Sequence, residues 1–312
     1  MTTTPPGTRA NTASSHTARW ELIRALAAVC DTPDAAATAS RALGLGHAAG
    51  DQHTQVFVLS CPPRAAIHLG PEGKLGGEAQ DRVAGFWRAI GLDPGTEPDH
   101  LCYLLSLYAH LGESGDAALR AGTRSAVERM RHALLWEHLW PWVPGYTRAV
   151  EQLDVPVISA WARLTRQVLT AELEAGVGAA AGASPLALRE APPPMRTDND
   201  LSDLLGGVVA PIRTGIVLTR EALAGAAGAI GIGYRIGERR FALRAMLEQD
   251  PPATLAWLRS EARRWAVRHH RSGDDTCSQW WARRAWHTAT VLGSLTRSAG
   301  AILVGADRHS DP

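Results

Sequence analysis

The chain has 312 residues, of which 45% are hydrophobic, and its formal net charge at pH 7 is +1. This length allows one large domain or two small ones, with enough apolar content for a core. A charge so close to zero supplies no general basic field, so nothing in it favours a nucleic-acid partner. The cysteines contain no Cys-x-x-Cys pair, which argues against a zinc or iron–sulfur site built on cysteine and fits reduced thiols: Cys30, Cys61, Cys102 and Cys277.

The N-terminal segment, residues 1–17, is rich in Thr, Ser and Pro and lacks the apolar run of a secretory signal. We expect it to be a disordered tail. No stretch approaches the ~20 apolar residues needed to span a bilayer. The most apolar candidate, residues 223–232, is short and rich in Ala and Gly. A cytoplasmic protein without stable membrane insertion is therefore expected.

Residues 18–176 read as a series of helices separated by Gly and Pro. One helical face is marked by positions that recur at i, i+4, i+7 and i+11, namely Val157, Trp161, Leu164 and Val168. The run 55–59 is β-like but isolated, so it predicts an extended loop or the start of a helix. Residues 67–77 form a glycine-rich loop. These patterns predict a helical core over residues 18–176.

The composition of residues 177–205 shifts to Ala, Gly and Pro, which predicts a linker. Residues 206–312 then read as a helical extension. Thr219 is expected to cap one helix, Asp250 followed by Pro251 to begin another, and residues 275–301 to form the last. One helix should bury the stripe Leu255, Leu258, Ala262 and Trp265. The fold class predicted for the whole chain is all-α.

Residues 97–100 read Glu-Pro-Asp-His and open an apolar helical run that continues through Tyr108 and Leu111. As the first turn of a helix, Thr96 and Asp99 resemble a capping box, and Pro98 would lose no hydrogen bond. Capping does not explain His100, whose positive form is disfavoured at a helix N-terminus. On a helical wheel, Glu97 and His100 fall beside the leucine stripe, and Asp99 points away from it.

A second unusual segment, residues 134–144, reads Leu-Leu-Trp-Glu-His-Leu-Trp-Pro-Trp-Val-Pro. Trp136 is expected to be a core aromatic, one helical turn before Trp140. Trp142 stands between two prolines and is less typical of a regular core position. Pro141 and Pro144 should end or bend the helix. His138 is expected at a helix end, where it makes local hydrogen bonds.

Together the two segments resemble the TorD/DmsD/NarJ-like maturation chaperones of molybdenum enzymes. That family has a Glu-x-x-Asp-His or Pro-Asp-His helix start and, further on, a His-Leu segment followed by Trp and Pro. The matching residues here are Glu97, Pro98, Asp99, His100, His138, Leu139, Trp142 and Pro144. The resemblance covers the first region and says little about residues 206–312.

The resemblance implies an all-α bundle of the TorD type that is no enzyme, with no cofactor or metal of its own. Its partner would be the apo form of a molybdopterin oxidoreductase catalytic subunit. The chaperone would bind that subunit's twin-arginine signal peptide or N-terminal segment, assist cofactor insertion and delay export. Whether it acts as a monomer or a homodimer stays open.

A receptor for two arginines followed by an apolar stretch needs carboxylates beside an apolar groove. Glu97 and Asp99 are the candidates for the acidic end, and His100 for orienting a carboxylate or contacting the peptide backbone. Trp136, Trp140 and Trp142 are candidates for the groove wall. The peptide-binding set we predict is Glu97, Pro98, Asp99, His100, His138, Leu139, Trp140, Trp142 and Pro144.

Two alternatives remain. The chain could be a helical interaction module for another partner, with the C-terminal region supplying the binding face. Glu97 and His100 also form the Glu-x-x-His pair of di-iron helix bundles. Such a site needs a second pair, which the sequence lacks. A di-metal oxidoreductase is thus the enzyme alternative.

Overall fold

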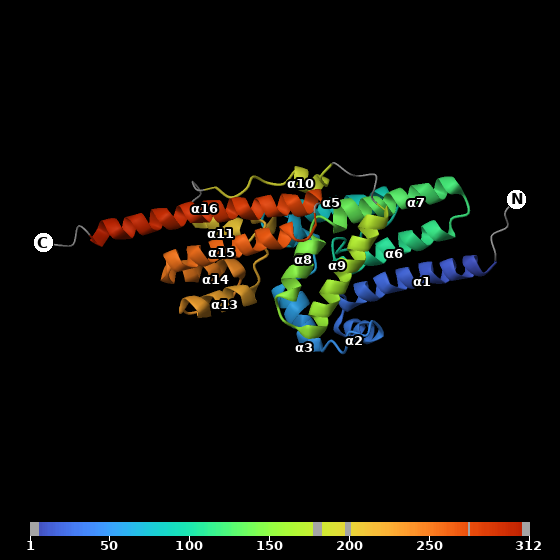
Figure 1. Cartoon of the computed structure of the whole chain (residues 1–312), viewed down its shortest axis with the longest axis horizontal. Helices are drawn as coiled ribbons and strands as arrows, with labels where there is room; N and C mark the ends of the chain where they lie inside the picture. The colour runs from blue at the N-terminus through green and yellow to red at the C-terminus, as the bar shows by residue number, and fades with distance from the viewer. Residues whose placement is uncertain (1–5, 177–182, 197–200, 274, 308–312) are drawn as a thin grey trace. The chain divides into compact units, whose positions relative to one another are not determined.

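The computed structural model describes residues 6–176, 183–196, 201–273 and 275–307, and their regular structure is helical (Figure 1). Within these ranges, pairing of the β type is limited to an isolated bridge between Arg64 and His100. The chain divides into two compact units. The first unit contains residues 1–65 and 77–181, and the second contains residues 66–76 and 182–312. The predicted all-α class is confirmed.

The first unit is built on α1 packed against α6, with α6 also against α7 and α8 against α9. Its helices are α1 (Pro6–Val29), α2 (Pro33–Ala42), α3 (Gly50–His53), η1 (Thr54–Ser60), α5 (Glu78–Ala89), α6 (Leu101–Ala117), α7 (Ala121–Ala133), η2 (Leu134–Leu139), α8 (Val143–Glu151) and α9 (Pro156–Gly176). Two of them, η1 and η2, are π-helical. Their wide turns are closed by bonds such as Cys61 N to Val56 O, 2.8 Å, and Trp140 N to Leu135 O, 2.7 Å.

The second unit is built on α15 packed along α16. After α4 (Ala65–Leu69), which starts at the unit boundary, its helices are α10 (Leu186–Arg189), α11 (Leu201–Val208), α12 (Pro211–Thr214), α13 (Arg220–Ile230), α14 (Arg239–Gln249), α15 (Pro251–His270) and α16 (Thr276–Asp307). No helix of the described residues is long and apolar enough to cross a membrane.

One expectation about local structure is corrected. The tail predicted over residues 1–17 is helical from Pro6 onward, while residues 1–5 lie outside the described part of the chain. Extending a helix that already packs through Trp20 adds backbone hydrogen bonds without a new nucleation cost. The β-like run 55–59 is helical, which is one of the two structures expected for it, and Phe57 packs against the rings of His53 and Trp161.

The predicted linker, residues 177–205, is structured where it is described. It contains α10, and Leu188 and Met195 are buried in the second unit. Arg284 Nη1 donates to the Pro192 carbonyl at 2.9 Å, and His287 Nε2 lies 2.9 Å from that of Met195. The composition predicted a linker because these contacts with α16 come from the tertiary structure, and composition carries no information about them. Residues 177–182 and 197–200 lie outside the described ranges.

Several helix signals were predicted correctly. Thr219 caps α13 by accepting from Ala222 N at 3.1 Å, and Asp250 caps α15 by accepting from Ala253 N at 2.9 Å. The stripe on α15 is buried as expected. On α9 the buried face is shifted by part of a turn from the predicted one, since Leu164 and Val168 are half-buried. The buried positions are Ile158, Ser159, Trp161, Ala162, Thr165, Leu169 and Glu172.

The glycine-rich segment 66–76 belongs to the second unit, although the sequence places it inside the predicted core. Arg213 Nε donates to the Pro71 carbonyl at 2.9 Å, and Arg239 Nη2 donates to that of Gly73 at 3.2 Å. Gly73 has φ +64°, and a Cβ there would lie 2.8 Å from the Val209 carbonyl oxygen. The loop can therefore adopt this conformation only with glycine at position 73.

Candidate functional site

Residues 97–100 lie just before α6 rather than in its first turn, and the cap is His100 instead of Thr96. The Nδ1 atom of His100 accepts a hydrogen bond from Cys102 N at 3.2 Å. The backbone of His100 is extended, with φ −71° and ψ 133°. The prediction that Glu97–His100 opens the helix was wrong by one turn, because these residues pair with another segment.

That partner is the segment 63–65. Ala65 N donates to the Asp99 carbonyl at 3.1 Å, and Leu101 N donates to the Pro63 carbonyl at 2.8 Å. These two bonds flank the bridge between Arg64 and His100. Residues 97–100 form a turn in which His100 N donates to the Glu97 carbonyl at 3.1 Å, and His100 itself is extended, so the helix begins only at Leu101.

Glu97 is the accessible acid of the site. Its carboxylate oxygen Oε1 lies 2.5 Å from Nη2 of Arg64, and the side chains of Glu97 and Arg64 are 44% and 18% exposed. Sequence reasoning missed Arg64, since it lies 33 positions away and no local pattern marks it. An exposed carboxylate held by a more deeply placed guanidinium is the main polar feature of this loop.

Asp99 lies differently from its prediction. A helical wheel pointed it away from the apolar stripe, but the residue is only 1% exposed. The wheel does not apply, because Asp99 precedes the helix and lies in the segment paired with residues 63–65. Pro98 is buried beside it. Asp99 therefore supports the loop from inside and does not reach the surface.

The His100 ring is neutral at physiological pH. Burial and the positive charge of Arg64 lower its pKa to about 4, against the opposite effects of Glu97 and Asp31. Its ring centroid lies 5.7 Å from that of Tyr103, which is 44% exposed. A neutral ring is needed for the cap, because protonated Nδ1 cannot accept the Cys102 hydrogen bond.

We expect the stability supported by His100 to be lost at mildly acidic pH. An unfolded histidine has a pKa of about 6.5, and the folded value is about 4. The unfolded chain therefore binds more protons in this window, so the contribution is complete above pH 6.5 and falls as the pH drops toward 4.

The measurement is the urea midpoint at pH 7 and pH 5 for wild type and His100→Asn. Asparagine is a good cap that does not titrate. The variant should therefore have the same urea midpoint as wild type at pH 7, and its midpoint should fall less between pH 7 and pH 5. Since His138 also titrates in this window, only the difference between the proteins reports His100. An equal loss in both would contradict the prediction.

Helix α5 joins the two sequence segments. Its Trp87 Nε1 donates to the Pro98 carbonyl at 3.2 Å, and Gln80 Nε2 donates to that of Thr96 at 3.2 Å. On the same helix, the Phe86 ring lies 4.8 Å from the His138 ring. No pattern in the sequence marks this role of α5, because adjacent aromatics on a helix are typical of ordinary packing.

The second segment forms η2 and the start of α8, and most of it is core. Its buried members are Leu134, Leu135, Trp136, His138, Leu139, Trp140, Pro141, Trp142 and Val143. Because prolines flank Trp142, it was not expected to be a regular core residue. It is only 1% exposed, and its Nε1 donates to the His138 carbonyl at 2.8 Å. The helix ends before Pro141, as expected. Pro144 lies in the first turn of α8, so it belongs to the next helix.

The His138 ring is also neutral at physiological pH, since burial and the nearby Arg82 charge lower its pKa to about 4. Direct contact between a ligand and the side chains of Trp140 or Trp142 would require this core to open. Their peptide-binding role stays a prediction, as does that of Leu139 and Pro144.

The geometry at Glu97 and His100 differs from that of a di-iron bundle. Such a site needs both side chains to project from one helix face into the bundle. Here both residues precede α6, Glu97 is paired with Arg64, and Nδ1 of His100 accepts a backbone hydrogen bond. These contacts give the pair a structural use that does not involve a metal.

The candidate site thus combines a partly exposed carboxylate, paired with Arg64, and a neutral histidine next to the partly exposed Tyr103. A family model described as "Nitrate reductase delta subunit" matches residues 17–148. Residues 17–148 are therefore similar to the nitrate reductase delta subunit family, the NarJ/TorD-like chaperones. These proteins are maturation chaperones of molybdoenzymes and are not enzymes. No curated protein and no solved structure matches the chain significantly.

Proposed function

We propose that this protein binds the twin-arginine signal peptide, or a comparable N-terminal segment, of a molybdopterin oxidoreductase catalytic subunit. Glu97 would pair with an arginine of that segment. The observation that carries the proposal is the Glu97 carboxylate, which is 44% exposed and bound to a guanidinium at 2.5 Å. A carboxylate and a guanidinium form the charge-assisted pair that such a leader requires.

Rigidity of the loop supports this role. The carbonyls of Pro98 and Asp99 accept hydrogen bonds from Trp87 and Ala65, and the chain then enters α6 under the His100 cap. A loop fixed before the ligand arrives loses little conformational entropy on binding, so more of the contact energy appears as affinity.

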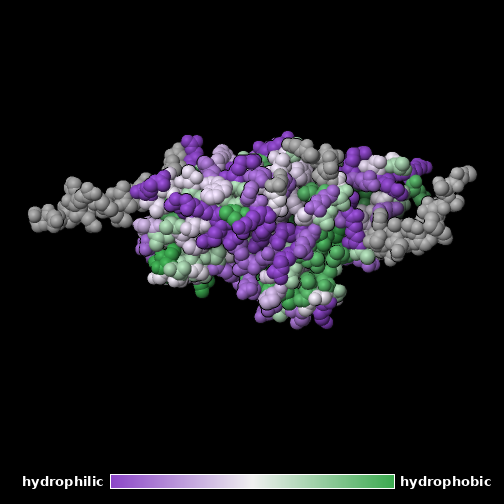
Figure 2. Space-filling model, viewed as in Figure 1, coloured by the Kyte–Doolittle hydropathy of each residue, from purple (hydrophilic) through white to green (hydrophobic). Residues whose placement is uncertain are grey.

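The apolar part of the leader needs its own surface. Val58 and Leu59 on η1 are 60% and 45% exposed, and Tyr103 on α6 is 44% exposed. Segment 63–65 connects η1 to the Glu97 loop. Figure 2 also shows hydrophobic residues gathered over the lower half of α9 in the same unit. We place the apolar stretch on the side chains of Val58, Leu59 and Tyr103.

The expected free energies agree with a division of the binding energy between the Glu97 carboxylate and the apolar surface. A charge-assisted hydrogen bond contributes about 1.5–3 kcal/mol, whereas micromolar binding requires about −8 kcal/mol. Burial of ~200 Å² of apolar surface adds about 5 kcal/mol, before the costs of association. The carboxylate therefore selects the arginines, and the apolar surface supplies much of the affinity.

We assign the rest of the predicted set to support of the site. Asp99 and Pro98 hold the loop from inside, and His138 contacts it through Phe86 on α5. Trp140 and Trp142 fix the segment that carries His138. The proposed chaperone core is residues 18–176, and residues 206–312 are an extension without an assigned role.

Binding the leader would delay export until the molybdenum cofactor has been inserted into the apo subunit. The leader of an exported enzyme is accessible only before export, so we place the chaperone in the cytoplasm. The work is done by binding alone, with no chemical step.

The test is titration calorimetry of the full-length chain with twin-arginine leader peptides from the organism's own molybdoenzymes. Glu97→Gln should weaken binding by about tenfold or more, since it removes a charge-assisted contact. The matched control is Glu128→Gln, an exposed glutamate on α7 of the same unit, which should leave affinity unchanged. Equal loss in both variants would argue for a general charge effect, and no loss would remove Glu97 from the site.

The full chain is needed because Arg213 and Arg239 of the second unit hold residues 66–76. Truncation at residue 200 would remove both arginines and leave that segment without its partners. Substitution of Asp99 is also a poor test of peptide binding. The residue is buried, so its replacement would disturb the fold as well as the site.

A further inference from the structure

The backbone of Arg64 is fixed on both sides. Its own N–H donates to the Pro62 carbonyl at 2.9 Å, and the bonds Ala65 N to Asp99 O and Leu101 N to Pro63 O flank it. Only the side chain of Arg64 has freedom to move. Its position over Glu97 therefore reflects the attraction between the two side chains.

In the structure without a peptide, the negative charge of Glu97 is already balanced by its ion pair with Arg64. The Arg64 guanidinium lies 2.5 Å from Glu97 Oε1, and it is the more covered partner, 18% against 44% exposed. An arginine from a peptide would bring the same chemical group to the same oxygen. A peptide arginine that binds the carboxylate through its two-pronged fork needs Oε1 as well as Oε2, so it competes with Arg64 for Oε1.

We propose that Arg64 is an internal occupant of the leader-peptide site, and that its guanidinium turns away from Glu97 when a peptide arginine binds there. The proposal rests on the proposed function, since it concerns the same carboxylate. Arg64 thereby lowers the affinity for the leader and favours its release after maturation.

The experiment compares leader-peptide affinity of wild type and Arg64→Gln by calorimetry on the full chain. Removing the competitor should tighten binding by about two- to fivefold, the range expected for a partly exposed ion pair. In the Arg64→Gln background, Glu97→Gln should cost more affinity than it does in wild type. A merely structural role for Arg64 would give no tightening.

The matched control is Arg24→Gln, which removes an arginine that pairs with Glu113 between α1 and α6 in the same unit. Glu113 lies roughly 18 Å along α6 from Leu101, at ~1.5 Å per residue, so this variant should bind like wild type. If Arg64→Gln does not fold, Arg64→Lys provides the test. Lysine keeps the charge without the planar fork, and it should give a smaller tightening.

The outcomes separate the two proposals. Tighter binding by folded Arg64→Gln, or binding by this variant alone, supports the internal occupant. Normal binding by wild type with equal or weaker binding by Arg64→Gln overturns it and leaves the proposed function standing. Absence of binding in both proteins overturns the proposed function and this inference together.

Discussion

Replacing Glu172 by glutamine is expected to lower the free energy of unfolding by about 3–5 kcal/mol, the usual cost of breaking a buried ion pair from one side. Glu172 lies on α9 and is only 5% exposed. It accepts hydrogen bonds from Tyr108 Oη at 2.7 Å, Arg131 Nη1 at 3.0 Å and Arg19 Nη2 at 2.5 Å. This one carboxylate thus connects α9 with α1, α6 and α7.

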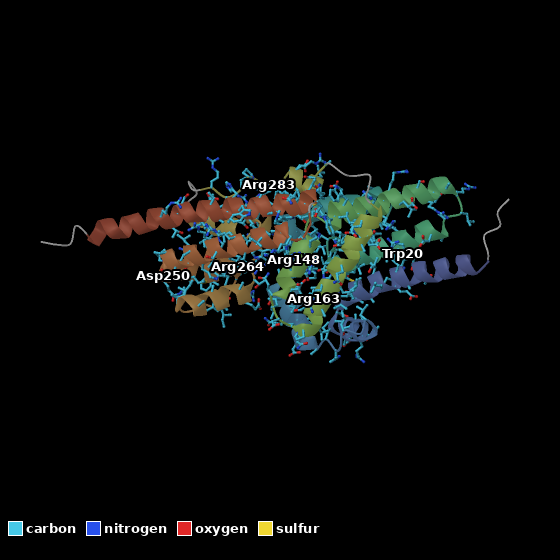
Figure 3. All side chains as sticks on the ribbon, viewed as in Figure 1. Trp20, Arg148, Arg163, Asp250, Arg264 and Arg283 are labelled. Atoms are coloured by element: carbon cyan, nitrogen blue, oxygen red, sulfur yellow. The ribbon has the colours of Figure 1, made fainter. Side chains whose placement is uncertain are left out.

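Trp20 completes the cluster from α1, where Figure 3 labels it. The guanidinium carbons of Arg19 and Arg131 lie 4.6 and 5.4 Å from its ring centroid, and its Nε1 donates to Asp116 at 2.7 Å. Glutamine in place of Glu172 would keep the volume but leave both guanidinium groups without their counter-charge.

The measurement is equilibrium unfolding of the full chain in urea, followed by circular dichroism. Glu174→Gln is the control, since Glu174 is exposed on the same helix, and a surface change of this kind should stay within about 0.5 kcal/mol. If the two variants lost stability equally, the network around Glu172 would not be a main support of the first unit.

Gly215→Ala is expected to destabilise the second unit by about 3 kcal/mol or more, as the sum of a left-handed backbone and a steric overlap. Gly215 ends α12 with φ +72°, and a Cβ there would lie 2.6 Å from Ala285 N and 2.9 Å from the Trp281 carbonyl oxygen. Both neighbours are backbone atoms of α16, so no side chain can move aside to relieve the contact.

The position is also an anchor. The Gly215 carbonyl oxygen lies 2.9 Å from Nε2 of His269, whose ring lies between those of Trp265 and Trp281 at centroid distances of 5.3 and 5.8 Å. A shift of α12 away from α16 would therefore break the hydrogen bond as well as the packing.

Gly231→Ala separates the two contributions. Gly231 ends α13 with φ +84°, but a Cβ there would meet nothing within 4 Å. This variant should lose only the conformational term, about 1–2 kcal/mol. Urea unfolding of both variants should thus show a clearly larger loss for Gly215→Ala, and equal losses would mean that α12 can move away from α16 at little cost.

Local signals determined much of the fold from sequence alone. Thr219 and Asp250 marked helix starts, Pro141 marked the end of η2, and the stripe containing Leu258 marked a buried face. These predictions succeeded because capping, proline geometry and helical periodicity act over a few neighbouring residues. The motifs at residues 97–100 and 134–144 likewise indicated the family, which the match to residues 17–148 confirmed.

Tertiary structure decided how the candidate site is arranged. The sequence placed Glu97–His100 inside a helix, but these residues form a turn before it that pairs with residues 63–65. Arg64 pairs with Glu97 from 33 positions away. Arg19 reaches Glu172 across 153 positions. Residues 66–76 pack in the second unit for the same reason. A carboxylate or a backbone carbonyl can accept a hydrogen bond from many donors, and only the packing of distant helices selects which donor comes within reach.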